Sequence, residues 1–208
     1  RLKNESDLTI KATFLGAHAI PSAFQNKREQ YIDSIRYEML PAIAEEQLAD
    51  YCDVFCERNY FTPEESTLIL EEGKKYKLIP KVHANQMSHS GGIELGVRMG
   101  ARSVDHLEYV SENDMDLLAN SNTIATILPG AQFFLGLPMP EAKKMLEKNI
   151  ALCIASDFNP GSCPSGNMQF MMAYAATSYK LTPEQCINAC TLNGAYAMGV
   201  ETDLGSIT

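Results

Sequence analysis

Short apolar runs alternate with amphipathic stretches along the whole chain. The runs predict buried strands over residues 11–18, 51–56, 78–83, 103–107, 123–128 and 151–156. The stretches between them have the composition and spacing of helices. Strands that alternate with helices indicate β/α units around a parallel sheet. The short spacing between strands favours a barrel over a doubly wound sheet.

Local signals indicate where several helices begin and end. Thr62-Pro63-Glu64-Glu65 and Thr182-Pro183-Glu184-Gln185 each combine a capping residue, a proline at the first helical position and a reciprocal acceptor. Gly73 is predicted to end the first of these helices, and Pro140 to begin another. Residues 27–48 have apolar side chains at helical spacing, with Pro41 as a break or kink.

Six strands cannot close an eight-stranded barrel. We therefore expect an α/β fold that is a partial (β/α)8 TIM-type barrel, containing roughly strands 3 to 8. The chain starts without an initiator Met and ends on a stretch typical of a new strand. We expect residues 1–203 to form an incomplete metal-dependent hydrolase barrel and 204–208 to begin a truncated small β domain.

Composition excludes several classes of function. The formal net charge is −9, which argues against binding to nucleic acid, whose phosphates require clustered Lys and Arg. No apolar run reaches the roughly 18 residues that a membrane-spanning helix needs. Six cysteines include no CxxC pair. They are interpreted as buried thiols of a reduced, cytoplasmic protein, with thiol-bound zinc as the less favoured alternative.

Candidate catalytic residues lie at the ends of predicted strands. Asp157 follows the run 151–155, and His83 and His106 end two other strands. In a β/α barrel, the carboxyl ends of the strands carry the chemistry, so these three side chains should share one rim. Imidazole and carboxylate suit zinc or iron better than magnesium or calcium. Such an ion lowers the pKa of bound water to about 7.

Each of these residues also has a structural interpretation. Either histidine alone could be a buried imidazole with one backbone partner, and Asp157 could cap a turn. His18 follows the first predicted strand and should face the same pocket, unless it is a loop histidine. His89 is interpreted as a solvated loop residue. Two protein ligands are too few for a catalytic zinc, which usually has three, so a further ligand is expected from elsewhere.

Several of these motifs occur together in one known family. They are His83-Ala84-Asn85-Gln86, Asp105-His106-Leu107-Glu108 and the run from Asp157 to Ser162, with Phe14–His18 upstream. With them, the chain resembles the imidazolonepropionases of the amidohydrolase superfamily. The resemblance implies a β/α barrel beside a small β domain and one zinc or iron ion. It also implies hydrolytic opening of 4-imidazolone-5-propanoate to N-formimidoyl-L-glutamate, in histidine degradation.

The resemblance also implies roles for individual residues. His83 and Asp157 would be metal ligands, and His106 would polarise the ring carbonyl. Independently of the resemblance, a strand-end aspartate such as Asp157 that touches metal and water can act as general base. The expected substrate-binding residues are His18, Gln86, Asn159, Gly161 and Ser162. The expected partner is a small-molecule substrate, and a homodimer is a candidate assembly.

One departure from the family is clear. The His-x-His pair that supplies two metal ligands in that family is absent from these 208 residues. We therefore expect this stretch alone to bind metal weakly and to turn over little substrate. Two alternatives stay open: another ring hydrolase or nucleobase deaminase of the same superfamily, or a non-catalytic scaffold.

Overall fold

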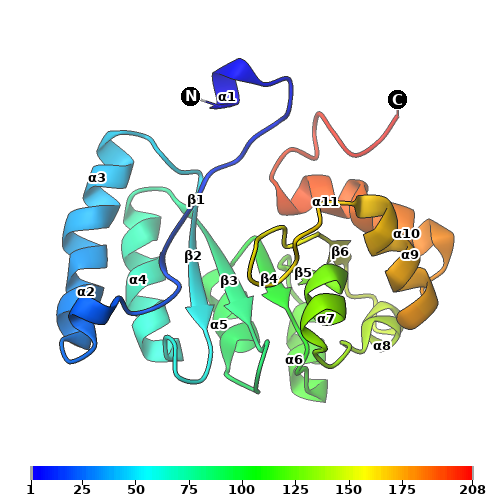
Figure 1. Ribbon diagram of the computed structural model, residues 1–208, viewed down its shortest axis with the longest axis horizontal. Coiled ribbons are helices and arrows are strands. Elements are labelled where there is room, and N and C mark those ends of the chain that lie inside the picture. The colour runs from blue at the N-terminus through cyan, green and yellow to red at the C-terminus, as the bar shows by residue number, and fades with distance from the viewer. Residues whose placement is uncertain (1, 208) are drawn as a thin grey trace.

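Six parallel strands form one sheet, in the same order in space as along the chain. The computed structural model describes residues 2–207, and Figure 1 shows the sheet with helices along it. Each strand pairs in parallel with the next. The strands are β1 (Thr13–Ala17), β2 (Tyr51–Cys56), β3 (Ile79–Ala84), β4 (Ser103–His106), β5 (Ile124–Ile127) and β6 (Leu152–Ile154).

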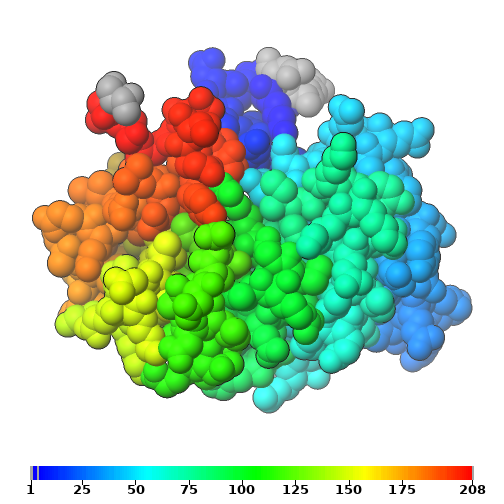
Figure 2. Space-filling model, turned by 180° about the vertical axis from the view of Figure 1, so that it is seen from behind, coloured from blue at the N-terminus to red at the C-terminus, as the bar shows by residue number. Residues whose placement is uncertain are grey.

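Helical segments connect the strands. Those before β4 are α1 (Leu2–Glu5), the 3₁₀ turn η1 (Ser22–Phe24), α2 (Arg28–Ser34), the π-helical η2 (Ile35–Met39), α3 (Leu40–Glu45), α4 (Pro63–Lys75) and α5 (Gly92–Met99). Those after it are α6 (Glu112–Ala119), α7 (Pro129–Leu135), α8 (Ala142–Glu147), α9 (Met168–Ser178), α10 (Pro183–Cys190) and α11 (Leu192–Ala197). Seen from behind, successive units follow one another around the molecule (Figure 2).

The two faces of the sheet differ in chemistry. Side chains of a strand alternate between faces, and the members of β2 and β3 that join the main hydrophobic core are apolar: Cys52, Val54, Cys56, Val82 and Ala84. The alternate positions carry Asp53, Lys81 and His83. Asp53 is the register partner of Lys81 and bonds to Nδ1 of His83. The sequence thus places a polar inner face opposite an apolar face that packs on helices.

The capping signals are confirmed, but the predicted end of α4 is wrong. Thr62 and Thr182 both form complete capping boxes. The helix continues past Gly73 to Lys75. Gly73 lies against β2, where an added Cβ would be 3.1 Å from the Cβ of Cys52. The glycine therefore allows close contact between helix and strand instead of ending the helix.

The expected break before Pro41 takes the form of a π-helical segment. The amide of Leu40 donates to the carbonyl of Ile35, five residues earlier, just before Pro41 begins the next α-helical stretch. Proline lacks an amide hydrogen, so an α-helical bond cannot form at that position. The wider turn carries the chain past it without ending the helical path.

The predicted partial barrel of parallel strands is confirmed, with small changes at strand ends. The last predicted strand, 151–156, is shorter, because β6 ends at Ile154. Among residues 2–207 the sheet is not closed, since β1 and β6 each pair on one side only. Residues 204–206 form bends, and residue 208 of the expected β-domain start lies outside the described residues. Within 2–207, no helix is long and apolar enough to cross a membrane.

The cysteines are free thiols, as expected. Five of the six are buried, and Cys190 is half-buried. Burial raises the pKa of Cys52, Cys56 and Cys153 to about 12. Protonated, buried thiols are poor nucleophiles and poor metal ligands, which agrees with a structural role for them.

Candidate active site

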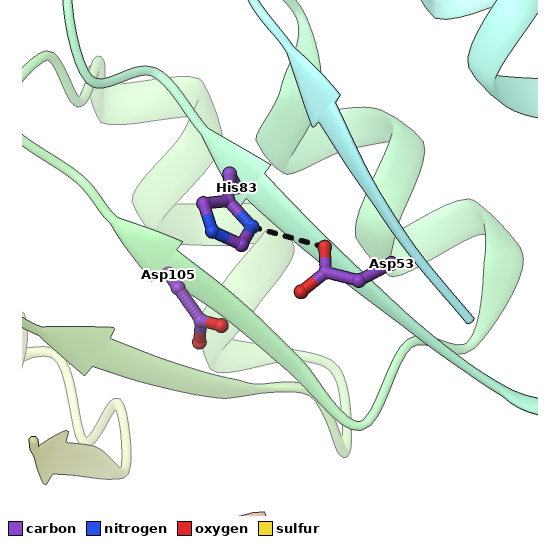
Figure 3. A group of neighbouring side chains, drawn as sticks. All are labelled: Asp53, His83 and Asp105. Atoms are coloured by element: carbon purple, nitrogen blue, oxygen red, sulfur yellow. Dashed lines mark hydrogen bonds and ion pairs between the residues drawn. The ribbon is translucent and has the colours of Figure 1, made fainter. Parts of the chain in front are cut away.

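His83 lies on the polar inner face between two aspartates from neighbouring strands. Its Nδ1 is 3.0 Å from Oδ1 of Asp53 on β2, and Asp105 on β4 approaches from the other side (Figure 3). Within 2–207, these three residues bring one ligand atom each to within 4.8 Å of one another. A carboxylate bonded to one ring nitrogen of a histidine leaves the other nitrogen oriented for an ion or a substrate.

Charges on this face are closely paired. Burial alone would lower the pKa of His83, but Asp53 and the neighbouring carboxylates outweigh it and raise that pKa to about 9. Lys81 lies two residues before His83 on β3 and therefore on the same face of the sheet. Its Nζ is 3.5 Å from Oδ2 of Asp105 and also contacts Ser103. Burial opposes the charge on Asp105, yet Lys81 and His83 lower its pKa. The inner face therefore combines two carboxylates with an imidazole and an ammonium group.

His18 and His106 flank His83 at the carboxyl end of the sheet. The ring centroids of His83 and His106 are 5.4 Å apart, and those of His18 and His83 are 5.9 Å apart. His18 also stacks on Phe55 at 5.3 Å. His106 has a positive φ of 90°, which turns the chain sharply where β4 ends. Three of the four histidines thus gather at one rim, while His89 is exposed, as expected.

Asp157 lies three residues beyond β6, in a loop that holds one side of its carboxyl group. Its backbone has a positive φ of 52°. Nδ2 of Asn159 donates to Oδ1 of Asp157 at 3.1 Å, while Oδ1 of Asn159 accepts from the amides of Gly161 and Ser162. Oδ2 of Asp157 is buried and has no hydrogen-bond partner among the described residues. The loop therefore fixes Asp157 and leaves one oxygen available.

A cavity of about 700 Å³ joins three of these side chains. His83, Asp105 and Asp157 all line it, together with Lys81 and Thr126. The remaining wall is mostly apolar and comes from β6, α9 and the segment 190–205. The cavity is large enough for a small heterocyclic molecule with a short side chain, since ligand pockets typically measure about 300–1,000 Å³.

The structure brings His83, His106 and His18 together and places Asp157 on the same cavity as His83. Gln86 follows β3 at the same end of the sheet and is half-buried. Asn159, Gly161 and Ser162 bond to one another within the Asp157 loop. The substrate and metal roles assigned to these residues stay predictions.

Three further charged residues at this site have no place in the sequence-based assignment: Asp53, Lys81 and Asp105. A signal for them exists in the sequence. Asp53 interrupts the apolar strand Tyr51–Cys56, and Lys81 precedes His83 with the period of two that puts both on one face. Charged residues inside buried strands are rare unless they are paired.

The residues of this rim fit a divalent metal ion. Oδ2 of Asp157 and Oδ1 of Asp105 are buried without hydrogen-bond partners among residues 2–207. An unpaired buried carboxylate oxygen is costly, and a cation would satisfy it. The ligand atoms of Asp53, His83 and Asp105 already lie within 4.8 Å of one another. These donors are of the right chemistry for such an ion, and Asp157 lines the same cavity as His83 and Asp105.

Sequence comparison identifies the family. Residues 22–208 match the Amidohydrolase family, and the chain belongs to it. An imidazolonepropionase from Flavobacterium johnsoniae is 48% identical over 208 residues, covering 100% of this chain and 51% of the relative. One from Flavobacterium psychrophilum is 51% identical over 201 residues, covering 97% and 49%. One from Caldanaerobacter subterraneus is 42% identical over 207 residues, covering 100% and 50%. The chain spans about half the length of these curated relatives.

Solved structures with a similar fold are hydrolases and deaminases. A zinc-bound adenosine deaminase from Xanthomonas campestris has a TM-score of 0.71 at 16% identity, covering 92% of this chain and 49% of that one. A triazine hydrolase variant has a TM-score of 0.76 at 12% identity, covering 98% and 51%. At such identities the likeness concerns the fold alone, and it agrees with the partial barrel described above.

Proposed function

We propose that this chain carries the site of an imidazolonepropionase, which opens the ring of 4-imidazolone-5-propanoate with water and yields N-formimidoyl-L-glutamate. The observation that supports this most is the 42–51% identity, along nearly the whole chain, to enzymes of that name. The rim of histidines and carboxylates around a cavity for a small molecule is the second support.

The ion is proposed to be zinc or iron, held by His83 and Asp157. The bond between Asp53 and Nδ1 of His83 leaves Nε2 as the ligand atom. Lys81 already neutralises Asp105, so the free oxygen of Asp157 is the better match for a cation than Asp105. When bound, such an ion supplies Lewis acidity and lowers the pKa of water to about 7.

The side chains of this chain would move the proton and hold the developing charge. Water attacks the ring carbonyl carbon, a C–O bond forms, and the adjacent C–N bond breaks. The carboxylate of Asp157 takes the proton from water and passes it to the leaving ring nitrogen. His106, beside His83, donates a hydrogen bond to the carbonyl oxygen as negative charge develops there.

Two further expectations follow from the same proposal. The partner is a small-molecule substrate. A cytoplasmic location is inferred because all six cysteines are free and five are buried, as is usual in reducing compartments. The homodimer stays a prediction.

A substrate panel tests the proposal. The complete gene product that contains this chain, purified with zinc, would be incubated with 4-imidazolone-5-propanoate, guanine and cytosine, and the products identified by mass spectrometry. We expect N-formimidoyl-L-glutamate from the first and no reaction with the other two. Deamination of guanine or cytosine without turnover of the imidazolone would contradict the proposal, and no turnover at all would favour a non-catalytic scaffold.

A further inference from the structure

Glu57, directly after β2, is a buried carboxylate with four hydrogen-bond donors. It is 3% exposed. One oxygen, Oε1, accepts from the amide of Arg58 at 2.7 Å and from the hydroxyl of Ser88. The other, Oε2, accepts from the amides of Met87 at 2.8 Å and Ser88 at 3.3 Å. A buried carboxylate is tolerated only when it is hydrogen-bonded in this way. Glu57 therefore ties the end of β2 to the loop that follows β3.

Asn85 anchors the other side of the same loop. It is 1% exposed and has a positive φ of 54°. Its Oδ1 accepts from the amide of Gly92 at 3.1 Å and the hydroxyl of Ser90 at 3.0 Å, and its Nδ2 donates to the carbonyl of Tyr109 at 2.9 Å. The loop is thus bonded to β2, α5 and the segment after β4.

Gln86 lies between these two anchors. Asn85 before it is buried, and the amides of Met87 and Ser88 after it are bonded to Glu57. Gln86 itself is half-buried, three residues beyond His83. Its backbone is therefore fixed on both sides, at the carboxyl end of β3.

We propose that Glu57 is a positioning residue for substrate binding, acting through Gln86. The inference rests on the proposed function, in which Gln86 contacts the substrate. Fixing the loop before the substrate arrives removes an ordering cost that binding would otherwise bear. Glu57 should consequently set the affinity for the substrate and leave the chemical step largely unchanged.

A carboxylate is required at this position because every neighbour donates. An ionised carboxylate only accepts hydrogen bonds, whereas a glutamine has an NH₂ group that would face a donor. Glu57→Gln keeps the size of the side chain but sets this NH₂ against either the Arg58 and Ser88 side or the Met87 and Ser88 side. Towards Met87 and Ser88 the NH₂ group loses two amide bonds. Towards Arg58 it loses the bond to that amide, while the Ser88 hydroxyl can turn and accept.

Steady-state kinetics on the complete gene product test the proposal. Glu57→Gln and Gln86→Ala should each raise KM for 4-imidazolone-5-propanoate about tenfold and change kcat less than about twofold. The double variant should be no worse than either single one, since both remove the same interaction. Glu71→Gln, an exposed glutamate on α4, is the matched control and should leave both constants unchanged. Additive effects in the double variant, or a fall in kcat with KM unchanged, would overturn the proposal.

Amide hydrogen exchange provides a readout that needs no turnover. The amides of Met87 and Ser88 should exchange markedly faster in Glu57→Ala, which removes both acceptor oxygens, than in the wild type, and those of β3 should not. Ser88→Ala, which removes a single donor, should produce a smaller effect in the same direction if Glu57→Ala fails to fold. Unchanged protection at Met87 would overturn the proposal whatever the substrate is. If the wild-type protein does not turn over the imidazolone, the proposed function is refuted, but the exchange result still tests the role of Glu57 in the loop.

Discussion

At the residue scale, the main side chains of the site each have one polar atom in a hydrogen bond with a neighbouring residue and a second polar atom left for a ligand. Asp53 holds Nδ1 of His83, and Asn159 holds Oδ1 of Asp157. In both residues the held atom fixes the orientation, and the free atom is the one that can meet an ion or substrate. Pre-positioned groups of this kind need little reorganisation during a reaction.

Asp157 is the residue on which the proposed chemistry depends most. Asp157→Asn keeps the shape of the side chain and its bond with Asn159 but removes the proton acceptor. In the complete gene product we expect kcat/KM for the imidazolone to fall by at least about 10³-fold, a loss at the upper end for general-base catalysis. Asp33→Asn, at an exposed position on α2, is the control. A variant with near-normal turnover and a normal circular dichroism spectrum would contradict the assignment.

The sequence allowed part of this site to be predicted, and the limit has a physical reason. His83, His106 and Asp157 follow apolar runs, so periodicity alone places them near strand ends. Asp53 and Glu57 were missed because their roles depend on contacts with a neighbouring strand or loop about 30 residues away. Such contacts follow from strand order and register, which local patterns do not specify.

At the element scale, helices are positioned by their ends and by small residues on their inner faces. The capping boxes of α4 and α10 were predictable, because both partners lie within four residues of sequence. The role of Gly73 was not, because it depends on the distance between α4 and β2. The π-helical form of the break before Pro41 likewise required coordinates.

The pair formed by Arg28 and Glu65 makes the attachment of α2 to α4 dependent on pH. Burial opposes the charge on Glu65, but the hydrogen bonds from Arg28 outweigh it and lower its pKa. A lowered carboxyl pKa contributes stability above the unfolded value of about 4.3, and this stability is lost as the pH falls through the folded pKa. Glu65→Gln removes the charge, while the glutamine can still complete the capping box. The variant therefore tests the effect of the charge alone.

We therefore expect Glu65→Gln to be less stable than the wild type at pH 7, with a difference that shrinks as the pH falls well below about 4.3. Urea unfolding at several pH values measures this. A difference that is independent of pH would show that the pair does not act through its charge.

Gly96 on α5 tests the contact between helix and sheet. A Cβ at this position would lie 2.3 Å from Cγ1 of Val104 on β4. Alanine has the higher helix propensity by about 1 kcal/mol, but overpacking costs about 1–3 kcal/mol and more when the neighbour is stiff. Gly96→Ala should therefore lower the free energy of unfolding by about 1–2 kcal/mol. The exposed Glu94→Ala should stay within about 0.5 kcal/mol of wild type. Equal or higher stability of Gly96→Ala would refute the close contact.

At the scale of the whole molecule, the fold gathers distant residues at one end of the sheet. Parallel strands in sequential order bring every carboxyl end to the same rim. In Figure 1 the β2 arrow points away from α1, so the carboxyl ends of the strands lie on the side opposite α1. This arrangement was predictable from the alternation of strands and helices. The missing closure between β1 and β6 was predictable from the number of strands.

The location of the metal ion is the central claim and can be measured directly. Crystals of the complete gene product grown with zinc would give an anomalous difference map at the zinc absorption edge. The account predicts one strong peak, about 2.0–2.2 Å from Nε2 of His83 and from Oδ2 of Asp157. A peak bonded to Asp53 and Asp105 without Asp157, or no peak at this rim, would contradict it.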